Sequence, residues 1–269
     1  MRRMHMNIIV CLKQVHDTEA VKLNPETNTL VRNGVENIMN PYDRQALETA
    51  LEMKDAHGAK VTVLSMGLPQ AADILKEAIA MGADDAVLVS DRALAGSDTL
   101  ATSIALAAAV KHIGGYDLVL CGRQAVDGDT AQVGPEMAEH LGIPQITGSQ
   151  KVTFENDKFI VERETENSAQ TMSCPAPLLV TVTRSEKEPR FASIKGKMKA
   201  RKAVIPTVTV ADLGLDTKLI GLSGSPTKVK KVFTPQVAKI ESVIINEEDM
   251  DAAVDMLFDK LVAANIIKR

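Results

Sequence analysis

One stretch of the sequence combines glycines, acids and an arginine in an arrangement that could bind a ligand. It runs from Cys121 to Gly142, reads CGRQAVDGDTAQVGPEMAEHLG, and follows the apolar run Leu118–Leu120. A glycine-containing turn between a strand and a helix is where α/β proteins often hold phosphate, because the N–H groups of the new helix face the anion. Gly122 and Gly128 would permit the sharp backbone geometry that such a turn needs.

The charged residues of this turn leave three interpretations open. Arg123 favours an anion, whereas Asp127 and Asp129 fit poorly against one and could instead accept hydrogen bonds from ribose hydroxyls or a ring N–H. The two acids could also bind a metal, although no further ligand cluster accompanies them. The simplest interpretation is a helix start capped by Asp129 or Thr130, with solvated acids.

Two other segments could contact the same ligand. Ser97–Thr102 opens a helical pattern after a strand, and its hydroxyls and amides suit a diphosphate. The alternative there is a plain helix cap at Ser97 or Asp98. The segment Met39–Asp43 contains the turn signal Asn-Pro just before a helix, so helix initiation alone could explain it.

The common catalytic motifs do not occur in the sequence. There is no Gly-x-Ser-x-Gly, Cys-x-x-Cys, Walker loop or Gly-x-Gly-x-x-Gly, and the five histidines are scattered. The residues by themselves therefore predict a nucleotide-binding protein without acid–base machinery of its own.

Alternating strand and helix patterns must position these segments. The expected strands are Asn7–Leu12, Lys60–Ser65, Ala86–Val89 and Leu118–Cys121, and the expected helices are Arg44–Ala56, Gln70–Met81, Asp98–His112 and Thr130–Leu141. This rhythm predicts an α/β fold with a doubly wound, mostly parallel, Rossmann-like sheet. With strand order 3-2-1-4, the first and fourth strands are neighbours, and ligands bind where the order reverses. The strand ends at Cys11 and Cys121 would then form the floor of the site.

The second half of the chain no longer shows the regular alternation of strand and helix patterns. A hairpin is expected from Lys151–Phe154 and Lys158–Arg163, and a further strand at Leu178–Thr183. A basic loop, 184–202, carries eight Lys or Arg against two Glu. We expect one α/β domain over residues 1–225 and an arm over 226–269, whose amphipathic helix near Glu247–Ala264 either packs on another chain or folds back.

Composition narrows the possible partners and compartment. The net charge of −4 and the lack of tryptophan argue against a nucleic-acid binder. The three cysteines have neither metal-ligand nor disulfide spacing, which indicates a reducing compartment, and we expect a cytoplasmic location. Neither a signal peptide nor a membrane span is expected, because the first apolar run is short and ends at Lys13.

Several motifs together resemble the beta subunit of electron-transfer flavoprotein over essentially the whole chain. They are VCLKQV, NIMNPYD, AMGADDAVLVSD, CGRQAVDGDTAQVGPEMAEHLGIPQ, EPRFASIKGKMKARK and GSPTKVKKVFTP. The resemblance implies a heterodimer with an alpha subunit that carries the mobile, electron-transferring FAD. It also implies an adenine nucleotide in the beta subunit, either a structural AMP or, in a bifurcating branch, a second FAD.

Two features of the sequence favour the FAD-binding branch. The turn reads GDTAQVGP, which resembles that branch, whereas the AMP type is more acidic and has an asparagine within the stretch matching Asp129–Gln132. The segment SDTLATS also resembles it. In that branch FAD accepts hydride from NADH and sends one electron to ferredoxin or flavodoxin and one to the FAD of the alpha subunit.

The resemblance also implies which residues contact the nucleotide. Thr130–Val133 would bind phosphate through the backbone, and Arg123 would stabilise a reduced, anionic flavin. The full set is Cys11, Asn40, Pro41, Tyr42, Asp43, Met66, Thr99, Thr102, Gly122, Arg123, Gln124, Ala125, Val126, Asp127, Gly128, Asp129, Thr130, Ala131, Gln132 and Val133.

The basic loop resembles the family's recognition loop for acyl-CoA dehydrogenases. Ile194 would be an apolar anchor inside a charged rim, and the docking residues would be Ile194, Lys195, Lys197, Met198 and Lys199. The alternative is a solvated basic loop. A third hypothesis, a stress-type adenine-nucleotide-binding module without a redox role, leaves this loop and the arm unexplained.

Overall fold

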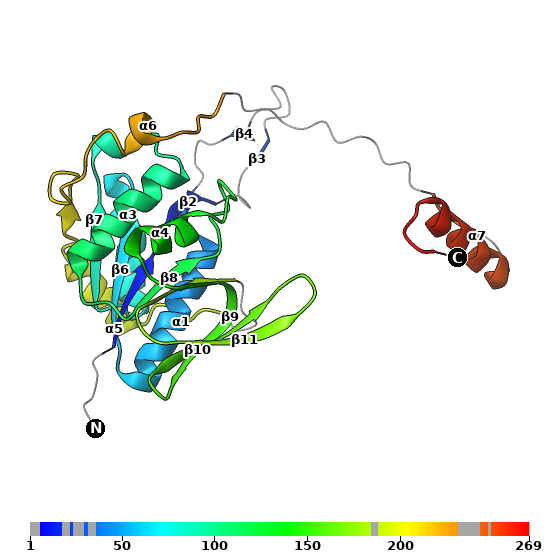
Figure 1. Ribbon diagram of the computed structural model, residues 1–269, viewed down its shortest axis with the longest axis horizontal. Helices are drawn as coiled ribbons and strands as arrows, with labels where there is room; N and C mark the ends of the chain where they lie inside the picture. The colour runs from blue at the N-terminus through cyan, green and yellow to red at the C-terminus, as the bar shows by residue number, and fades with distance from the viewer. Residues whose placement is uncertain are drawn as a thin grey trace. The chain divides into compact units, whose positions relative to one another are not determined.

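The architecture comes from a computed structural model that describes residues 6–17, 22–23, 30–31, 36–183, 188–230, 243–246 and 249–268. Its main sheet has nine strands in the order β11-β10-β9-β12-β8-β1-β6-β7-β13 (Figure 1). The strands of this sheet are β1 Asn7–Cys11, β6 Lys60–Met66, β7 Asp85–Val89, β8 Leu118–Gly122, β9 Gln145–Glu155, β10 Lys158–Glu164, β11 Ala169–Cys174, β12 Leu178–Val182 and β13 Thr207–Val208. Two small sheets pair β2 Gln14–His16 with β5 Asn37–Met39, and β3 Lys22–Leu23 with β4 Leu30–Val31.

The central strands confirm the predicted fold class and strand order. The strands β12, β8, β1, β6 and β7 are parallel neighbours, and β1 lies between β6 and β8. They are almost wholly buried because helices cover both faces, which is why they appear in the sequence as continuous apolar runs. The order reverses between β1 and β8, and Cys11 is in register with Cys121 at that point.

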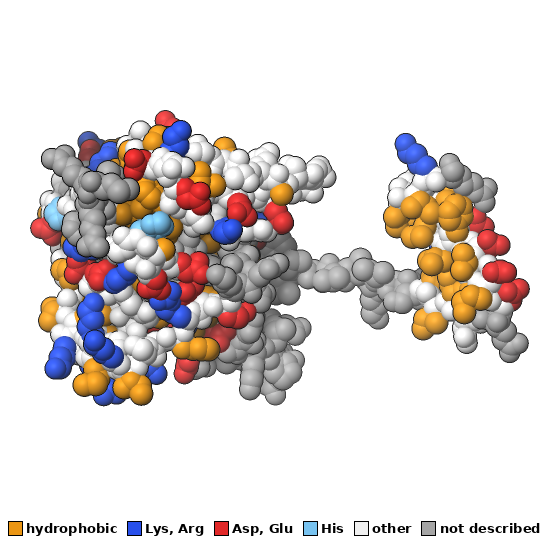
Figure 2. All heavy atoms as spheres, turned by 90° about the horizontal axis from the view of Figure 1, so that it is seen from below, with side chains coloured by type: hydrophobic (Ala, Val, Ile, Leu, Met, Phe, Trp, Pro, Cys, Tyr) orange, Lys and Arg blue, Asp and Glu red, His pale blue; other side chains and the backbone are white. Residues whose placement is uncertain are grey.

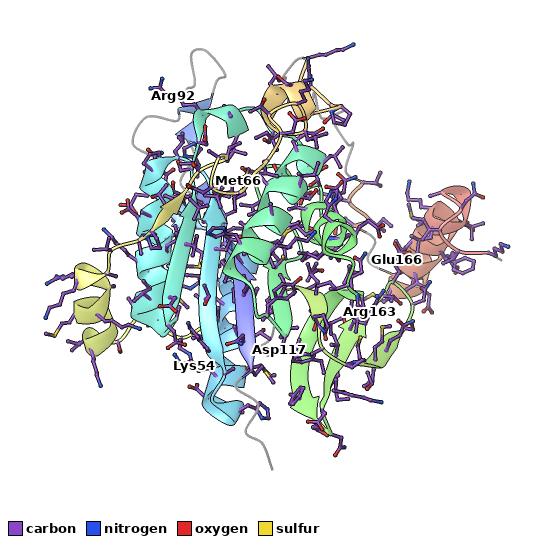
Figure 3. The ribbon with its side chains drawn as sticks, turned by 60° about the vertical axis from the view of Figure 1, so that its left-hand side comes forward. Lys54, Met66, Arg92, Asp117, Arg163 and Glu166 are labelled. Carbon is purple, nitrogen blue, oxygen red and sulfur yellow. The ribbon has the colours of Figure 1, made fainter. Side chains whose placement is uncertain are left out.

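Helices form a layer on each face of the sheet. The helices are α1 Pro41–His57, α2 Ala72–Met81, α3 Thr99–Ile113, α4 Val133–Leu141, α5 Ile194–Lys202, α6 Gly221–Gly224 and α7 Met250–Ala263, with 3-10 turns η1 Pro69–Ala71 and η2 Arg92–Leu94. Side chains of α1 and α2 share one core with one face of the sheet, and those of α3 and α4 share a second core with the other face. Figure 3 shows Met66 and Asp117 near opposite ends of the parallel strands, so the carboxyl edge can be followed from Met66.

The predicted hairpin is present and extends the main sheet. Strands β9 and β10 pair antiparallel, β11 adds a third antiparallel strand, and β9 joins the parallel core through β12. The basic segment was expected to be a loop, but residues 194–202 form the helix α5, and residues 184–187 lie outside the described part. The helix begins where the Ser193 hydroxyl accepts a hydrogen bond from the N–H of Gly196.

The chain divides into two compact units, Met1–Lys228 and Val229–Arg269. Thr227, near the end of the first unit, is hydrogen-bonded to Asp98 in the same unit. In the second unit α7 carries exposed apolar side chains, among them Val254, Leu257 and Phe258. Figure 2 shows apolar side chains of this unit gathered together, with acidic side chains along another side. Within the described residues, no helix is both long and apolar enough to cross a membrane.

Candidate functional site

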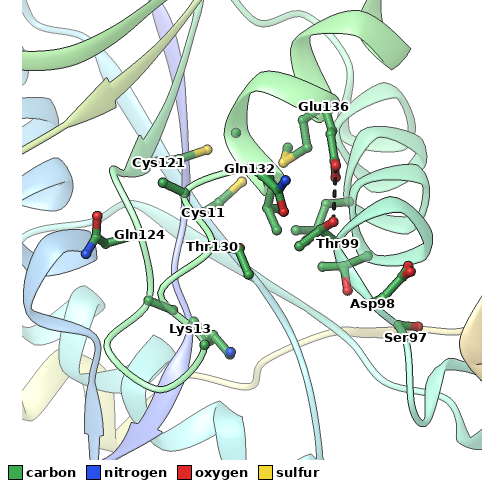
Figure 4. A pocket seen from close by; sticks show the side chains of 18 of the residues that line it. Cys11, Lys13, Ser97, Asp98, Thr99, Cys121, Gln124, Thr130, Gln132 and Glu136 are labelled. Atoms are coloured by element: carbon green, nitrogen blue, oxygen red, sulfur yellow. Dashed lines mark hydrogen bonds between the residues drawn. The ribbon is translucent and has the colours of Figure 1, made fainter. Parts of the chain in front are cut away.

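A cavity of about 950 Å³ opens at the carboxyl edge of the sheet, at the predicted switch point. Its floor is formed by the ends of β1 and β8, which include Cys11 and Cys121 (Figure 4). The turn that leads into α4 forms one wall, and the start of α3 forms another. Pro226 and Thr227 reach the cavity from the far end of the first unit.

Most of the residues expected to bind a nucleotide line this cavity. They are Cys11, Asp43, Met66, Thr99, Thr102, Gly122, Arg123, Gln124, Ala125, Gly128, Asp129, Thr130, Ala131, Gln132 and Val133. The remaining expected residues are not part of the cavity lining that the described residues form. They are Asn40, Pro41, Tyr42, Val126 and Asp127.

Asp43 connects the two strand ends that form the floor. Its carboxylate accepts hydrogen bonds from the N–H of Lys13 at 2.7 Å and the N–H of Gly122 at 3.1 Å. Burial raises the pKa of Asp43 from 3.8 to about 7, and hydrogen bonds from Lys13, Asn40 and Gly122 oppose that rise. The residue therefore holds β1, β8 and the start of α1 together behind the ligand space.

Two of the four glycines that line the cavity, Gly122 and Gly134, lie where other atoms come close to the backbone. A Cβ on Gly122 would collide with the Asp43 carboxylate, and a Cβ on Gly134 would lie 2.6 Å from Cγ2 of Thr181. These contacts let α1 and α4 pack directly against the strand ends. The ligand can consequently approach the backbone of the turn as well as its side chains.

The acids of the turn have protein partners, which settles part of the ambiguity in the sequence. The carboxylate of Asp127 accepts two hydrogen bonds from Nζ of Lys13, each at 2.8 Å, and Asp129 accepts one from the Gln124 amide. Asn40 bonds the backbone on both sides of Ala125, at Gln124 and Val126. No group of three metal-binding side chains occurs among the described residues. The acids thus hold the turn in shape.

The start of α4 differs from the prediction. The helix begins at Val133, three residues of the expected helix stay outside it, and its cap residue Gln132 makes no side-chain cap bond, so the predicted cap at Asp129 or Thr130 is wrong. The reason is that Asp129 and Ala131 both have φ of 53°, in the left-handed region that non-glycine residues rarely adopt. Backbone that alternates with left-handed residues can turn successive N–H groups to one side, which is how proteins form concave anion sites.

The start of α3 forms a second polar wall. The Asp98 side chain accepts a hydrogen bond from the N–H of Ala101 and so caps the helix, as one of the sequence alternatives expected. Its other oxygen accepts hydrogen bonds from the N–H and the hydroxyl of Thr227, at 3.0 and 2.8 Å. Burial would raise the pKa of Asp98, but these hydrogen bonds outweigh it and lower that pKa below 3.8.

The Cys121 thiol on the floor is held in its protonated form. The hydrogen bond with the Cys11 thiol, together with burial, raises the pKa of Cys121 well above its ordinary value. A protonated thiol is a poor nucleophile, so Cys121 acts as a small apolar group on the floor of the cavity.

Several residues that line the cavity were not among the individually expected nucleotide contacts. Cys121 was expected only as part of the floor, Ser97, Asp98 and Leu100 only as part of the segment Ser97–Thr102, and Gly134, Glu136 and Met137 only as part of the stretch Cys121–Gly142. The others are Leu12, Lys13, Leu94, Gly96, Leu106, Pro226 and Thr227. A signal was available for Lys13, which directly follows the end of the first strand, and for Glu136, which lies in the first turn of the helix after the glycine turn. Pro226 and Thr227 gave no local signal, because only the tertiary fold brings them to α3.

The expected docking residues lie together on α5, away from the cavity. Ile194 is 83% exposed and Met198 is 59% exposed, next to Lys195 and Lys197. Lys199 differs from the others, because its Nζ donates to the carbonyl oxygens of Ala83 and Asp84 and anchors the helix.

Comparison with known proteins agrees with this geometry. Residues 27–213 match the electron transfer flavoprotein domain family. The chain is 50% identical to the electron transfer flavoprotein subunit beta of Megasphaera elsdenii, over 97% of this chain and all of that protein. It is 43% identical to the caffeyl-CoA reductase-Etf complex subunit CarD of Acetobacterium woodii, over 97% of this chain and all of that one. It is also 43% identical to protein FixA of Azorhizobium caulinodans, over 98% and 95% of the two chains. The chain therefore belongs to the electron transfer flavoprotein family, as a beta subunit.

Proposed function

We propose that this beta subunit binds FAD in the switch-point cavity and works as the NADH-oxidising half of a bifurcating electron transfer flavoprotein. The partner is an alpha subunit with its own FAD, and the electron acceptors are ferredoxin or flavodoxin and, through the alpha-subunit FAD, an acyl-CoA dehydrogenase. The second candidate is a non-bifurcating subunit that binds a structural AMP in the same place. The free thiols suit a cytoplasmic location for either candidate.

The extent of the cavity is the observation that supports FAD over AMP. Its volume of about 950 Å³ is near the upper end of the roughly 300–1,000 Å³ typical of ligand sites. It runs from the turn before α4 to the start of α3 and on to Pro226 and Thr227. A mononucleotide at the turn would leave the α3 end of this space to solvent, whereas a dinucleotide has the length to fill both ends.

The residues of the chain bind and orient the cofactor and leave the redox chemistry to it. When bound, FAD supplies hydride acceptance and the release of electrons one at a time. The backbone before α4 binds phosphate, and the floor at Cys11 and Cys121 keeps water from beneath the ligand. Arg123 lines the cavity, is exposed, and makes no ion pair within the described residues, so its charge is free to balance a reduced flavin.

The proposed partners correspond to two exposed surfaces. The apolar face of α7 suits a protein partner, and we assign it to the alpha subunit. Ile194 and Met198 on α5, with the lysines around them, suit a transient contact, which we assign to the dehydrogenase. The name of the Acetobacterium woodii relative couples an Etf complex to a caffeyl-CoA reductase, which is consistent with a CoA-ester oxidoreductase as the partner.

An anaerobic titration with NADH tests this proposal. The purified heterodimer is titrated and its flavin absorbance followed, first for the natural protein and then for Arg123→Gln. We expect NADH to bleach the beta-subunit flavin, and Arg123→Gln to lower the potential of that flavin while FAD stays bound. A heterodimer whose flavins NADH cannot reduce would contradict the bifurcating function and favour the AMP-binding candidate.

A further inference from the structure

Glu136 carries a carboxylate oxygen that the protein leaves without a partner. The residue lies in the first turn of α4 and lines the cavity. One oxygen, Oε1, accepts a hydrogen bond from the hydroxyl of Thr99 at 3.1 Å, across the gap between α4 and α3 (Figure 4). The other oxygen, Oε2, is buried and has no hydrogen-bond donor among the described residues.

Packing alone does not account for this oxygen. A carboxylate near the starts of α3 and α4 is favoured by both helix dipoles, and the bond from Thr99 fixes its position. Neither effect supplies a donor to Oε2. Buried polar atoms are nearly always hydrogen-bonded, and one left unpaired costs about 1–3 kcal/mol. A donor that belongs to the ligand would remove that cost.

The position of Glu136 indicates which group of the ligand could donate to Oε2. It lies three residues after Val133, close in sequence to the left-handed residues Asp129 and Ala131, whose kind of backbone favours an anion. A second phosphate oxygen beside Glu136 would be repelled by the carboxylate. The hydroxyl donors closest to the phosphate of a nucleotide belong to its sugar, and an acidic residue is a common acceptor for them.

We propose that Glu136 is a specificity residue whose Oε2 accepts a hydrogen bond from a sugar hydroxyl next to the bound phosphate. The hydroxyl belongs either to the adenosine ribose, which AMP and FAD share, or to the ribityl chain, which only FAD has. This inference rests on the proposed nucleotide site. If the proposal is correct, the wall between α3 and α4 contacts the sugar, and the phosphate binds only at the turn before α4.

The proposal is tested by removing single hydroxyl groups from the ligand and the carboxylate of Glu136 from the protein. Binding is measured by calorimetry on the heterodimer freed of nucleotide, for the natural protein and for Glu136→Met. The probes are AMP, 2′-deoxy-AMP and 3′-deoxy-AMP for the ribose, and FAD with FAD analogues that lack one ribityl hydroxyl for the ribityl chain. We expect the loss of one of these hydroxyl groups to weaken binding to the natural protein about tenfold or more. The same loss should leave the affinity of Glu136→Met unchanged.

Two further measurements keep the outcome unambiguous. Glu139→Gln, an exposed acid on the same helix, should bind every probe as the natural protein does. In the nucleotide-free state Glu136→Met should melt at the same or a higher temperature, because it removes an unpaired buried oxygen. The proposal is overturned if every hydroxyl deletion reduces the affinity of both proteins by the same factor. It is also overturned if Glu136→Met lowers the melting temperature and leaves the affinities unchanged. Failure of the natural protein to bind either AMP or FAD would instead overturn the nucleotide site itself.

Discussion

Gly122 is the residue whose replacement tests the packing of the cavity floor most simply. Its missing Cβ leaves the space that the Asp43 carboxylate and the α1 backbone occupy. We expect Gly122→Ala to lower the free energy of unfolding by about 1–3 kcal/mol, because β8 and α1 would have to move apart. Gly128→Ala is the matched control, since nothing lies within 4 Å of a Cβ there. Chemical denaturation of both variants checks this, and equal stabilities would contradict it.

The buried carboxyl of Asp43 should make stability depend on pH. Its pKa in the folded protein is about 7 against an ordinary 3.8, so the folded state holds a proton that the unfolded state has released between these values. The free energy of unfolding should consequently fall as pH rises from about 4 to 7, by about 1.4 kcal/mol per pH unit at most, and level off above.

The variant Asp43→Asn isolates this contribution from other titrating groups. Its amide cannot accept from both Lys13 and Gly122, so the variant should be less stable at every pH. Its stability should also fall less steeply than that of the natural protein between pH 4 and 7. Denaturation series across that range measure both curves, and parallel curves would rule out titration of Asp43.

At the scale of elements, the segment 219–228 is held to the start of α3. Thr227→Val deletes the hydroxyl that donates to Asp98 and keeps the backbone N–H bond. Loss of one hydrogen bond costs about 1 kcal/mol, so amide exchange in this segment should speed up several-fold. Thr217→Val, at an exposed site of the same region, should leave exchange unchanged. If both variants exchange alike, the Asp98 contact does not hold the segment.

The helix α5 makes a second prediction at this scale. Ile194→Ala should slow electron delivery to the acyl-CoA dehydrogenase about tenfold at limiting dehydrogenase, because an exposed apolar anchor is lost from the contact. Lys197→Glu should slow it further by reversing a charge of the rim. Val204→Ala, 90% exposed just beyond the helix, is the control. Coupled turnover with the heterodimer measures all three, and unchanged rates for Ile194→Ala would remove α5 from the docking surface.

Sequence patterns predicted the elements whose signals are local. The continuous apolar strands and their order followed from burial on both faces, and they placed Cys11 beside Cys121 correctly. The left-handed turn was not predictable, since the conformation is rare for alanine, the residue type at Ala131, even though aspartate, as at Asp129, adopts it more often. The helix α5 was missed because Gly196 and many lysines suggest a loop. Tertiary contact requires that glycine, since a Cβ there would collide with the carbonyl of Ala80.

At the scale of the whole molecule, the chain has a cavity proposed to bind the nucleotide and two exposed surfaces proposed to bind partners. The cavity lies within the first unit, while the apolar face of α7 belongs to the second. Family membership follows from the comparisons over nearly the full chain. The identity of the nucleotide is what separates a bifurcating subunit from one that only supports its partner's flavin.

Cofactor content of the purified heterodimer tests that central claim most directly. The nucleotides are released by denaturation, separated, and counted by absorbance and mass spectrometry against protein concentration. The account predicts two FAD and no AMP for each heterodimer. One FAD and one AMP for each heterodimer would contradict it.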